Sequence, residues 1–210
     1  MLQKFIKNYL KWHSVEHKLN SAHYNDLAKN PIQPEALIVS CCDSRILANN
    51  IFDAKVGELF IHRTIANLIP PFDQVEKHLA TASVIEFSVQ KLCVKDIIIL
   101  GHSACAGIAA LKDLDQLSED NQYLASWLSQ DKRLLALSRE GHSCKELEKK
   151  SIINSIRNLG EYPVIDKATS RSALRIHGLW LDIGSGVLEL YDTGSDCFIP
   201  LATSEHNHSD

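Results

Sequence analysis

The first half of the chain alternates between helix-like and strand-like hydrophobic patterns. Bulky apolar residues recur at helical spacing from Leu2 to Trp12, so we expect a helix over residues 2–28. Short, continuous apolar runs are typical of buried strands, and they lie at 36–40, 59–62 and 97–100. A further helix is expected over 74–92, after the break at Pro70-Pro71.

The second half is expected to be helix-rich and then to end in a hairpin. Residues 106–160 predict about three helices. Two late strands are expected near 174–182 and 187–191, and Gly184-Ser185-Gly186 between them is typical of a hairpin turn. The predicted fold class is therefore α/β: a mostly parallel, mixed sheet flanked by helices, with an antiparallel edge strand and an N-terminal helical arm.

We expect three parts along the chain. They are an N-terminal helical arm over 1–30, a single α/β domain over 31–200 that carries the catalytic site, and a polar, disordered tail over 201–210. The apolar stripe of the arm is bulky for a terminal segment. It is therefore expected to pack on another surface, such as a second subunit.

The composition narrows the class of protein. A net charge of -4 without a Lys/Arg cluster argues against nucleic acid as the main partner. No apolar run approaches the roughly 20 residues that span a bilayer, and the N-terminus lacks the apolar segment of a signal peptide. The six cysteines are irregularly spaced, unlike those of a secreted disulfide framework. We therefore expect a cytoplasmic protein with no membrane partner.

The strongest chemical signal is a pair of motifs, each of which directly follows a predicted buried strand. Cys41-Cys42-Asp43-Ser44-Arg45 follows the first strand, and His102, three residues before Cys105, follows the third. In open α/β sheets, ligand sites form at the carboxyl ends of the strands. Two thiolates and one imidazole are ligands that Zn²⁺ prefers, and three protein ligands with one open position are the pattern of catalytic zinc.

The residues alone leave two assignments open. Either Cys41 or Cys42 could face the metal, although the spacing to the aspartate and the arginine favours Cys41. Asp43 and Arg45 could form an ordinary loop salt bridge. Next to Cys41 we favour a catalytic pair, in which Arg45 holds Asp43 and keeps it ionised.

The remaining cysteines and histidines are weaker candidates. Cys93 is expected in the apolar core, and Cys197 has no assigned role. Cys144 belongs to a Gly-His-Ser-Cys run that resembles the metal motif, but it follows a charged helical stretch, so we do not expect metal there. His206 and His208 could bind metal adventitiously, but a solvated tail is the simpler interpretation.

With these motifs in place, the chain resembles the β-class carbonic anhydrases from about residue 25 to 192. The matching stretches lie at 41–45, 57–73, 83–92, 97–108 and 177–192. The run from Asn67 to Asp73 looks most like the plant-type branch, and a bacterial member is expected. The resemblance implies a homodimer or a dimer of dimers, in which the N-terminal helices reach across to the partner.

The resemblance also implies roles for single residues. Zinc would be held by Cys41, His102 and Cys105, and Asp43 and Arg45 would form the catalytic dyad. The implied substrate-pocket residues are Phe60, Ile65, Phe87 and Gln33. The implied activity is that of a lyase, the reversible hydration of carbon dioxide to bicarbonate and a proton by attack of a zinc-bound hydroxide. The rival hypotheses are a related zinc hydrolase of the carbon disulfide type and a non-catalytic zinc-binding oligomeric protein.

The chain departs from the family pattern at several pocket positions. Ala106-Gly107 stands where the family usually has Gly-Gly, and Thr64 stands where an asparagine is usual. Phe87 replaces a frequent tyrosine, and the pocket glutamine is shifted by one position to Gln33. Some bacterial members bind a second, inhibitory bicarbonate beside an arginine matched by Arg63. Ile38 and Leu181 replace the tryptophan and the tyrosine of that site, so we predict that it is absent.

Overall fold

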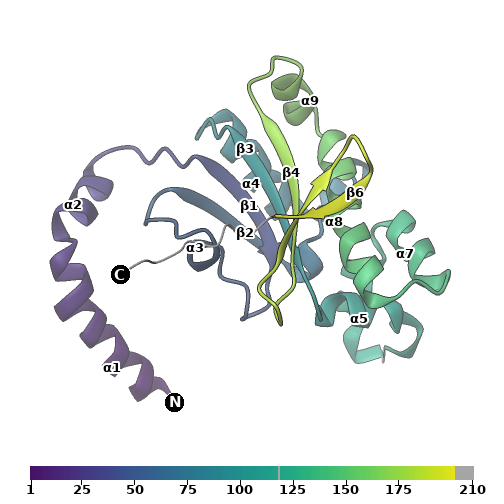
Figure 1. The fold of residues 1–210 in the computed structure, drawn as a ribbon, viewed down its shortest axis with the longest axis horizontal. Helices are drawn as coiled ribbons and strands as arrows, with labels where there is room; N and C mark the ends of the chain where they lie inside the picture. The colour runs from purple at the N-terminus through teal and green to yellow at the C-terminus, as the bar shows by residue number, and fades with distance from the viewer. Residues whose placement is uncertain (118, 202–210) are drawn as a thin grey trace, which may run out of the picture. The chain divides into compact units, whose positions relative to one another are not determined.

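The computed structural model describes residues 1–117 and 119–201, and its contacts divide the chain into a unit Met1–Gln33 and a unit that begins at Pro34 (Figure 1). The first unit holds α1 (Leu2–Trp12), a π-helical turn (His13–His17) and α2 (Ser21–Lys29), where one helix was expected. The rings of Trp12, His17 and Tyr24 pack on one another within this unit, with centroids 4.8 to 5.8 Å apart.

The second unit is built on one six-stranded sheet of order β2-β1-β3-β4-β5-β6. The strands are β1 (Ala36–Cys41), β2 (Leu59–Thr64), β3 (Asp96–His102), β4 (Arg175–Leu181), β5 (Leu188–Asp192) and β6 (Cys197–Pro200). The first four strands of the chain pair in parallel, whereas β5 and β6 are antiparallel. The predicted fold class is confirmed. The short strand β6 was not predicted, because only four residues at the sheet edge form it.

Strands β1 and β3 carry apolar side chains on both faces of the sheet, and the two faces are covered to different extents. One face packs under α4 (Leu79–Gln90), α8 (Cys144–Gly160) and α9 (Pro163–Thr169). The opposite face packs around Ile46 and α3 (Ala48–Ile51), and it keeps several apolar side chains only half-buried. These half-buried side chains include Leu59, Ile61 and Ile98.

The helical connections differ in detail from the expected ones. The predicted helix over 74–92 is a 3₁₀ segment (Phe72–Lys77) followed by α4. The region after β3 contains α5 (Ala106–Lys112), two 3₁₀ turns (Leu114–Gln116 and Glu119–Asn121), α6 (Gln122–Ser129), α7 (Lys132–Arg139) and α8. None of the helices in the described ranges combines the length and apolar character that crossing a bilayer requires.

Two cysteines illustrate how position along an element decides exposure. The expectation that Cys93 lies in the core is wrong: α4 ends at Gln90, and Cys93 is exposed in the following turn with φ 54°. Cys144 begins α8 directly after Ser143, which forms a capping box with Glu146. The Gly-His-Ser-Cys run is therefore a helix start.

The predicted tail, including His206 and His208, lies outside the described residues apart from Leu201.

Candidate active site

Two neighbouring parallel strands bring the candidate metal ligands to the same edge of the sheet. Cys41 is the last residue of β1, and His102 is the last residue of β3, which pairs with β1. Cys105 follows after a short turn, at the position that caps the start of α5. The two sulfur atoms are 3.8 Å apart, and the three ligand atoms all lie within 4.8 Å of one another, buried from solvent.

The imidazole of His102 is oriented as a metal ligand. Its Nδ1 lies 2.8 Å from the carbonyl oxygen of Ser103, and a carbonyl can only accept, so Nδ1 carries the proton. In the neutral imidazole, Nε2 is then an unprotonated acceptor, and it is buried without a hydrogen-bond partner among the residues that the structure describes. Such an orphaned atom inside a protein needs an explanation. Two sulfur atoms and this nitrogen, converging from three sides, form a donor set that fits Zn²⁺ with one position open.

The sulfur atoms of Cys41 and Cys105 are close enough for the thiol of one to donate its proton in a hydrogen bond to the other. Donation from the Cys105 thiol lowers the pKa of Cys41, and the same contact raises the pKa of Cys105. A metal ion would displace that proton, because thiolates rather than thiols bind metals. Metal binding should therefore depend on pH.

The loop after Cys41 is held by hydrogen bonds from the neighbouring strand β2. Arg63, on β2, donates hydrogen bonds to three backbone carbonyls of this loop, those of Cys41 (3.1 Å), Asp43 (2.6 Å) and Ile46 (3.0 Å). The guanidinium therefore shapes the turn that presents Asp43. The sequence suggested Arg63 only as a match to a regulatory site, and no local pattern predicted this contact.

Asp43 and Arg45 form a closely fitted pair at the edge of the site. The Arg45 side chain donates to both carboxylate oxygens, at 2.9 and 2.7 Å, and the Arg45 backbone N–H donates to one of them at 2.9 Å. The same guanidinium donates to the carbonyl of Ala104 at 3.0 Å, which ties the two motifs together. Arg45 holds the pKa of Asp43 well below its usual range, so the carboxylate is ionised and can only accept hydrogen bonds.

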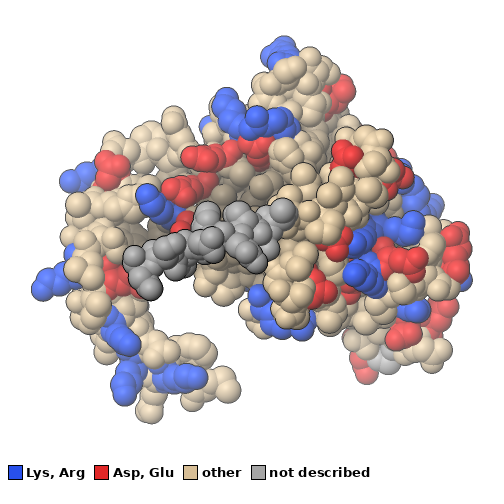
Figure 2. Space-filling model, in the orientation of Figure 1, with Lys and Arg blue, Asp and Glu red and all other residues tan. Residues whose placement is uncertain are grey.

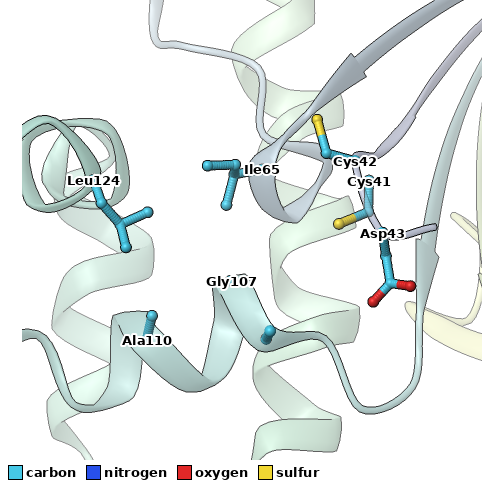
Figure 3. A pocket seen from close by; sticks show the side chains of 8 residues that line it. Cys41, Cys42, Asp43, Ile65, Gly107, Ala110 and Leu124 are labelled. Carbon is cyan, nitrogen blue, oxygen red and sulfur yellow. The ribbon is translucent and has the colours of Figure 1, made fainter. Parts of the chain in front are cut away.

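A mostly apolar cavity of about 290 Å³ opens beside the cluster (Figure 3). It is lined by Cys41, Cys42, Asp43, Ile65, Ala106, Gly107, Ala110 and Leu124. In Figure 3 the sulfur of Cys42 points away from Asp43. The sulfur of Cys41, in contrast, lies 3.8 Å from that of Cys105. The geometry therefore favours Cys41 over Cys42 as a ligand.

Ile65 lines the cavity between the cysteines and Leu124 (Figure 3). Its carbonyl accepts a hydrogen bond from the indole N–H of Trp127 at 3.0 Å. A side chain added at Gly107 would place its Cβ only 2.7 Å from Ile65 Cγ2, so a glycine is needed for this close approach. Trp127 was not a sequence candidate, because its contact spans 62 residues.

The other expected pocket residues are not among those that line this cavity, and their role in the substrate pocket stays a prediction. Phe60 and Phe87 contact each other, with ring centroids 5.9 Å apart, and neither lines the cavity formed by the described residues. Phe87 is 47% exposed. Gln33 ends the N-terminal unit. Thr64, where the family pattern has asparagine, is buried and donates to the carbonyl of Leu68 at 3.0 Å.

A parallel sheet that gathers a buried Cys–His–Cys cluster, an ionised aspartate and an apolar cavity at one edge has the architecture of an α/β metalloenzyme. Residues 36–188 match the family model described as carbonic anhydrase, and the chain belongs to this family. Among curated proteins it is similar to beta carbonic anhydrase 3 of Arabidopsis thaliana, with 28% identity over 91% of this chain and 77% of the relative.

The solved structures give the same result. The chain superimposes on the beta-carbonic anhydrase CcaA with a TM-score of 0.89 and 25% identity, over 97% of this chain and 93% of the other. It also superimposes on one of two tetrameric beta-carbonic anhydrases of Sordaria macrospora with a TM-score of 0.77 and 27% identity, over 90% of this chain and 95% of the other. A second Arabidopsis thaliana relative, the chloroplastic beta carbonic anhydrase 5, is 29% identical over 82% of this chain, which spans 58% of that protein.

Proposed function

We propose that the protein catalyses the reversible hydration of carbon dioxide to bicarbonate and a proton, with Zn²⁺ held by Cys41, His102 and Cys105. The observation that carries this proposal is the convergence of three buried ligand atoms within 4.8 Å of one another, one of them the Nε2 of His102, to which no described residue offers a hydrogen bond. When bound, Zn²⁺ supplies a Lewis acid that lowers the pKa of a coordinated water from 15.7 to about 7.

The residues around the cluster then orient the reactants. The Asp43 carboxylate, fixed by Arg45, can accept a hydrogen bond from the reacting water and direct an oxygen lone pair into the cavity. Because Asp43 is ionised and has no proton to give, its role is to accept and orient. The walls formed by Ile65, Ala106 and Leu124 suit carbon dioxide, which is apolar and uncharged.

We also infer a homodimer or a dimer of dimers. Apolar side chains of α1 are exposed, among them Leu2, Phe5, Ile6, Tyr9 and Leu10, and the sheet face around Ile98 is incompletely covered. Apolar surface of this kind is typical of protein–protein contacts. The relatives from Sordaria macrospora are tetrameric by their description.

The free cysteines and the charge distribution support a reducing compartment and a small substrate. All six cysteines are free, which supports the cytoplasm over a secretory compartment. Figure 2 shows acidic and basic side chains interspersed on the face in view, and the net charge is -4. Both observations support a small neutral substrate over nucleic acid.

The decisive experiment is a pH profile of carbon dioxide hydration by stopped flow, with zinc quantified on the same sample. Asp43→Ala should keep stoichiometric zinc and lose most activity, whereas Cys41→Ser, His102→Ala or Cys105→Ser should lose zinc. A parallel assay with carbon disulfide tests the related hydrolase. A fully zinc-loaded protein that hydrates no carbon dioxide at any pH would refute the proposal.

A further inference from the structure

A buried carboxylate lies directly behind the ligand cluster. Glu148, on α8, is only 3% exposed. One carboxylate oxygen accepts a hydrogen bond from the backbone N–H of Cys105 at 3.1 Å, and the other accepts from the indole N–H of Trp180 at 3.3 Å. Both partners are neutral groups rather than cations. Burying an acid in this way is costly unless its acceptor oxygens are needed where they lie.

The hydrogen bond to Cys105 holds a strained turn. Ala104, directly before Cys105, has a left-handed backbone with φ 55°, which an L-residue adopts only at a cost. Neighbouring contacts fix the start of this turn, since Ser103 N–H donates to Leu181 O at 2.9 Å and Arg45 donates to Ala104 O at 3.0 Å. Glu148 fixes its end, at the backbone from which the Cys105 sulfur projects toward Cys41.

The indole that donates to the second oxygen of Glu148 is itself held in place by its surroundings. Trp180, on β4, is 1% exposed, and the ammonium groups of Lys145 and Lys149 lie 4.9 and 4.7 Å from its ring centroid. Lys149 also pairs with Glu189 on the neighbouring strand β5. Because both of its oxygens are engaged by N–H groups, Glu148 acts through the backbone and does not belong to the Cys–His–Cys group.

We propose that Glu148 is a positioning residue of the metal centre: it bridges the Cys105 backbone to Trp180 and thereby sets the direction of the Cys105 thiolate. This inference rests on the proposed zinc site. Removing a residue that holds a metal ligand in place typically weakens metal binding by about 10- to 100-fold. A Glu148→Ala protein would leave the buried N–H of Cys105 without an acceptor, and the turn could then relax.

The first test measures zinc affinity by competition with a chromophoric chelator, on the full chain at fixed pH. Glu148→Ala should bind zinc about 10- to 100-fold more weakly than the wild type. The thiolate-to-metal absorption bands of the cobalt-substituted protein should also shift. Asn158→Ala is the matched control, since Asn158 is equally buried on α8 but donates to Ile69 O (2.8 Å) and to Asp131 (3.0 Å). It should lose stability while keeping zinc affinity and the cobalt spectrum.

The second test is a rescue that does not depend on Glu148→Ala folding. In Glu148→Gln, one end of the amide is an N–H donor, so either Cys105 or Trp180 faces a donor instead of an acceptor, and zinc affinity should fall. Adding Trp180→Phe removes the competing indole donor. The amide oxygen can then face Cys105, and zinc affinity should recover relative to Glu148→Gln alone.

The outcomes separate this inference from the proposed function. If the wild type holds zinc and hydrates carbon dioxide, the proposed function stands. The inference is then overturned by a Glu148→Ala protein with wild-type zinc affinity and cobalt spectrum. It is also overturned by an Asn158→Ala protein that weakens zinc binding equally, or by a double variant no tighter than Glu148→Gln. A wild-type protein that binds no zinc would overturn both.

Discussion

Gly107→Ala tests whether the substrate wall depends on the close approach of α5 to the turn after β2. The added Cβ would lie 2.7 Å from Ile65 Cγ2 and 3.2 Å from both the Cβ and the backbone nitrogen of Ala66. The backbone at Ala66 cannot yield easily, because it is already left-handed with φ 59°. We therefore expect the Ile65 side chain to be displaced within the cavity that it lines.

The expected magnitude follows from two opposing effects. Overpacking of a tight contact costs about 1–3 kcal/mol. Alanine is a better helix former than glycine by at most about 1 kcal/mol, and Gly107 is the second residue of α5. The free energy of unfolding should therefore fall by about 0.5–2 kcal/mol. With a urea slope of about 2 kcal/mol per molar, the unfolding midpoint should shift by roughly 0.3–1 M.

The assay compares Gly107→Ala with Gly160→Ala, the same chemical change where it meets no steric obstacle. Gly160 ends α8, and a Cβ built there meets no neighbouring atom of the described residues within 4 Å. Gly160→Ala should leave the urea midpoint unchanged or raised and should keep kcat/KM for carbon dioxide. Gly107→Ala should lower both quantities, measured at one protein concentration because the proposed assembly would contribute to stability. If Gly107→Ala were as stable and as active as Gly160→Ala, the close-contact argument would be refuted.

Three further predictions concern separate parts of the structure. Trp127→Phe removes the donor to Ile65 O but keeps a ring beside His78, so kcat/KM measured by stopped flow should fall about threefold to tenfold. The control Trp12→Phe should leave kcat/KM unchanged. If the two variants had the same kcat/KM, the proposed role of the contact between Trp127 and Ile65 would be contradicted. Adding zinc at 100 times its Kd to the zinc-free protein should raise the free energy of unfolding by about 2.7 kcal/mol, as followed by thermal unfolding. If the same zinc concentration stabilised His102→Ala equally, the assignment of His102 as a ligand would be contradicted. Asp96, whose pKa is lowered by Arg175 and then by His177, should stabilise the fold above pH 4 and lose that effect as the pH falls through its lowered pKa. The thermal midpoint of Asp96→Asn should therefore lie below the wild-type value at pH 7 and converge with it in acid, whereas a constant difference would rule out the linkage.

Much of the fold could be predicted because its signals are local. The apolar runs at 36–40 and 97–100 predict buried parallel strands. The motifs that follow these runs lie where β1 and β3 end side by side. Local patterns were less useful for the connections. The 3₁₀ segment before α4 and the exposed turn at Cys93 depend on where α4 begins and ends, and the apolar residues around them suggested one continuous helix.

The residues that complete the site could not be predicted from spacing, because they act across long stretches of chain. Arg63 lies 20 residues from Asp43, Trp127 lies 62 residues from Ile65, and Glu148 lies 43 residues from Cys105. Each is a polar or amphipathic side chain whose partner is a backbone group. A backbone partner leaves no trace in the sequence, since every residue other than proline has the same N–H and C=O groups.

Helix α8 shows why the pattern of apolar residues does not predict the side chains that support the site. Its buried side chains include Ser151, Ser155 and Asn158, so its inner face reads as polar. Ser155 donates to Asn67 O and accepts from Ile69 N–H, both at 3.1 Å, and the Asn67 side chain donates to Ser151 at 3.2 Å. These contacts hold the turn after Ile65, where Ala66 and Asn67 are both left-handed with φ of 59° and 50°. The conformation that presents Ile65 to the cavity is therefore stabilised by a helix more than 80 residues further along the chain. A helix buried for hydrophobic packing alone would not supply these hydrogen bonds.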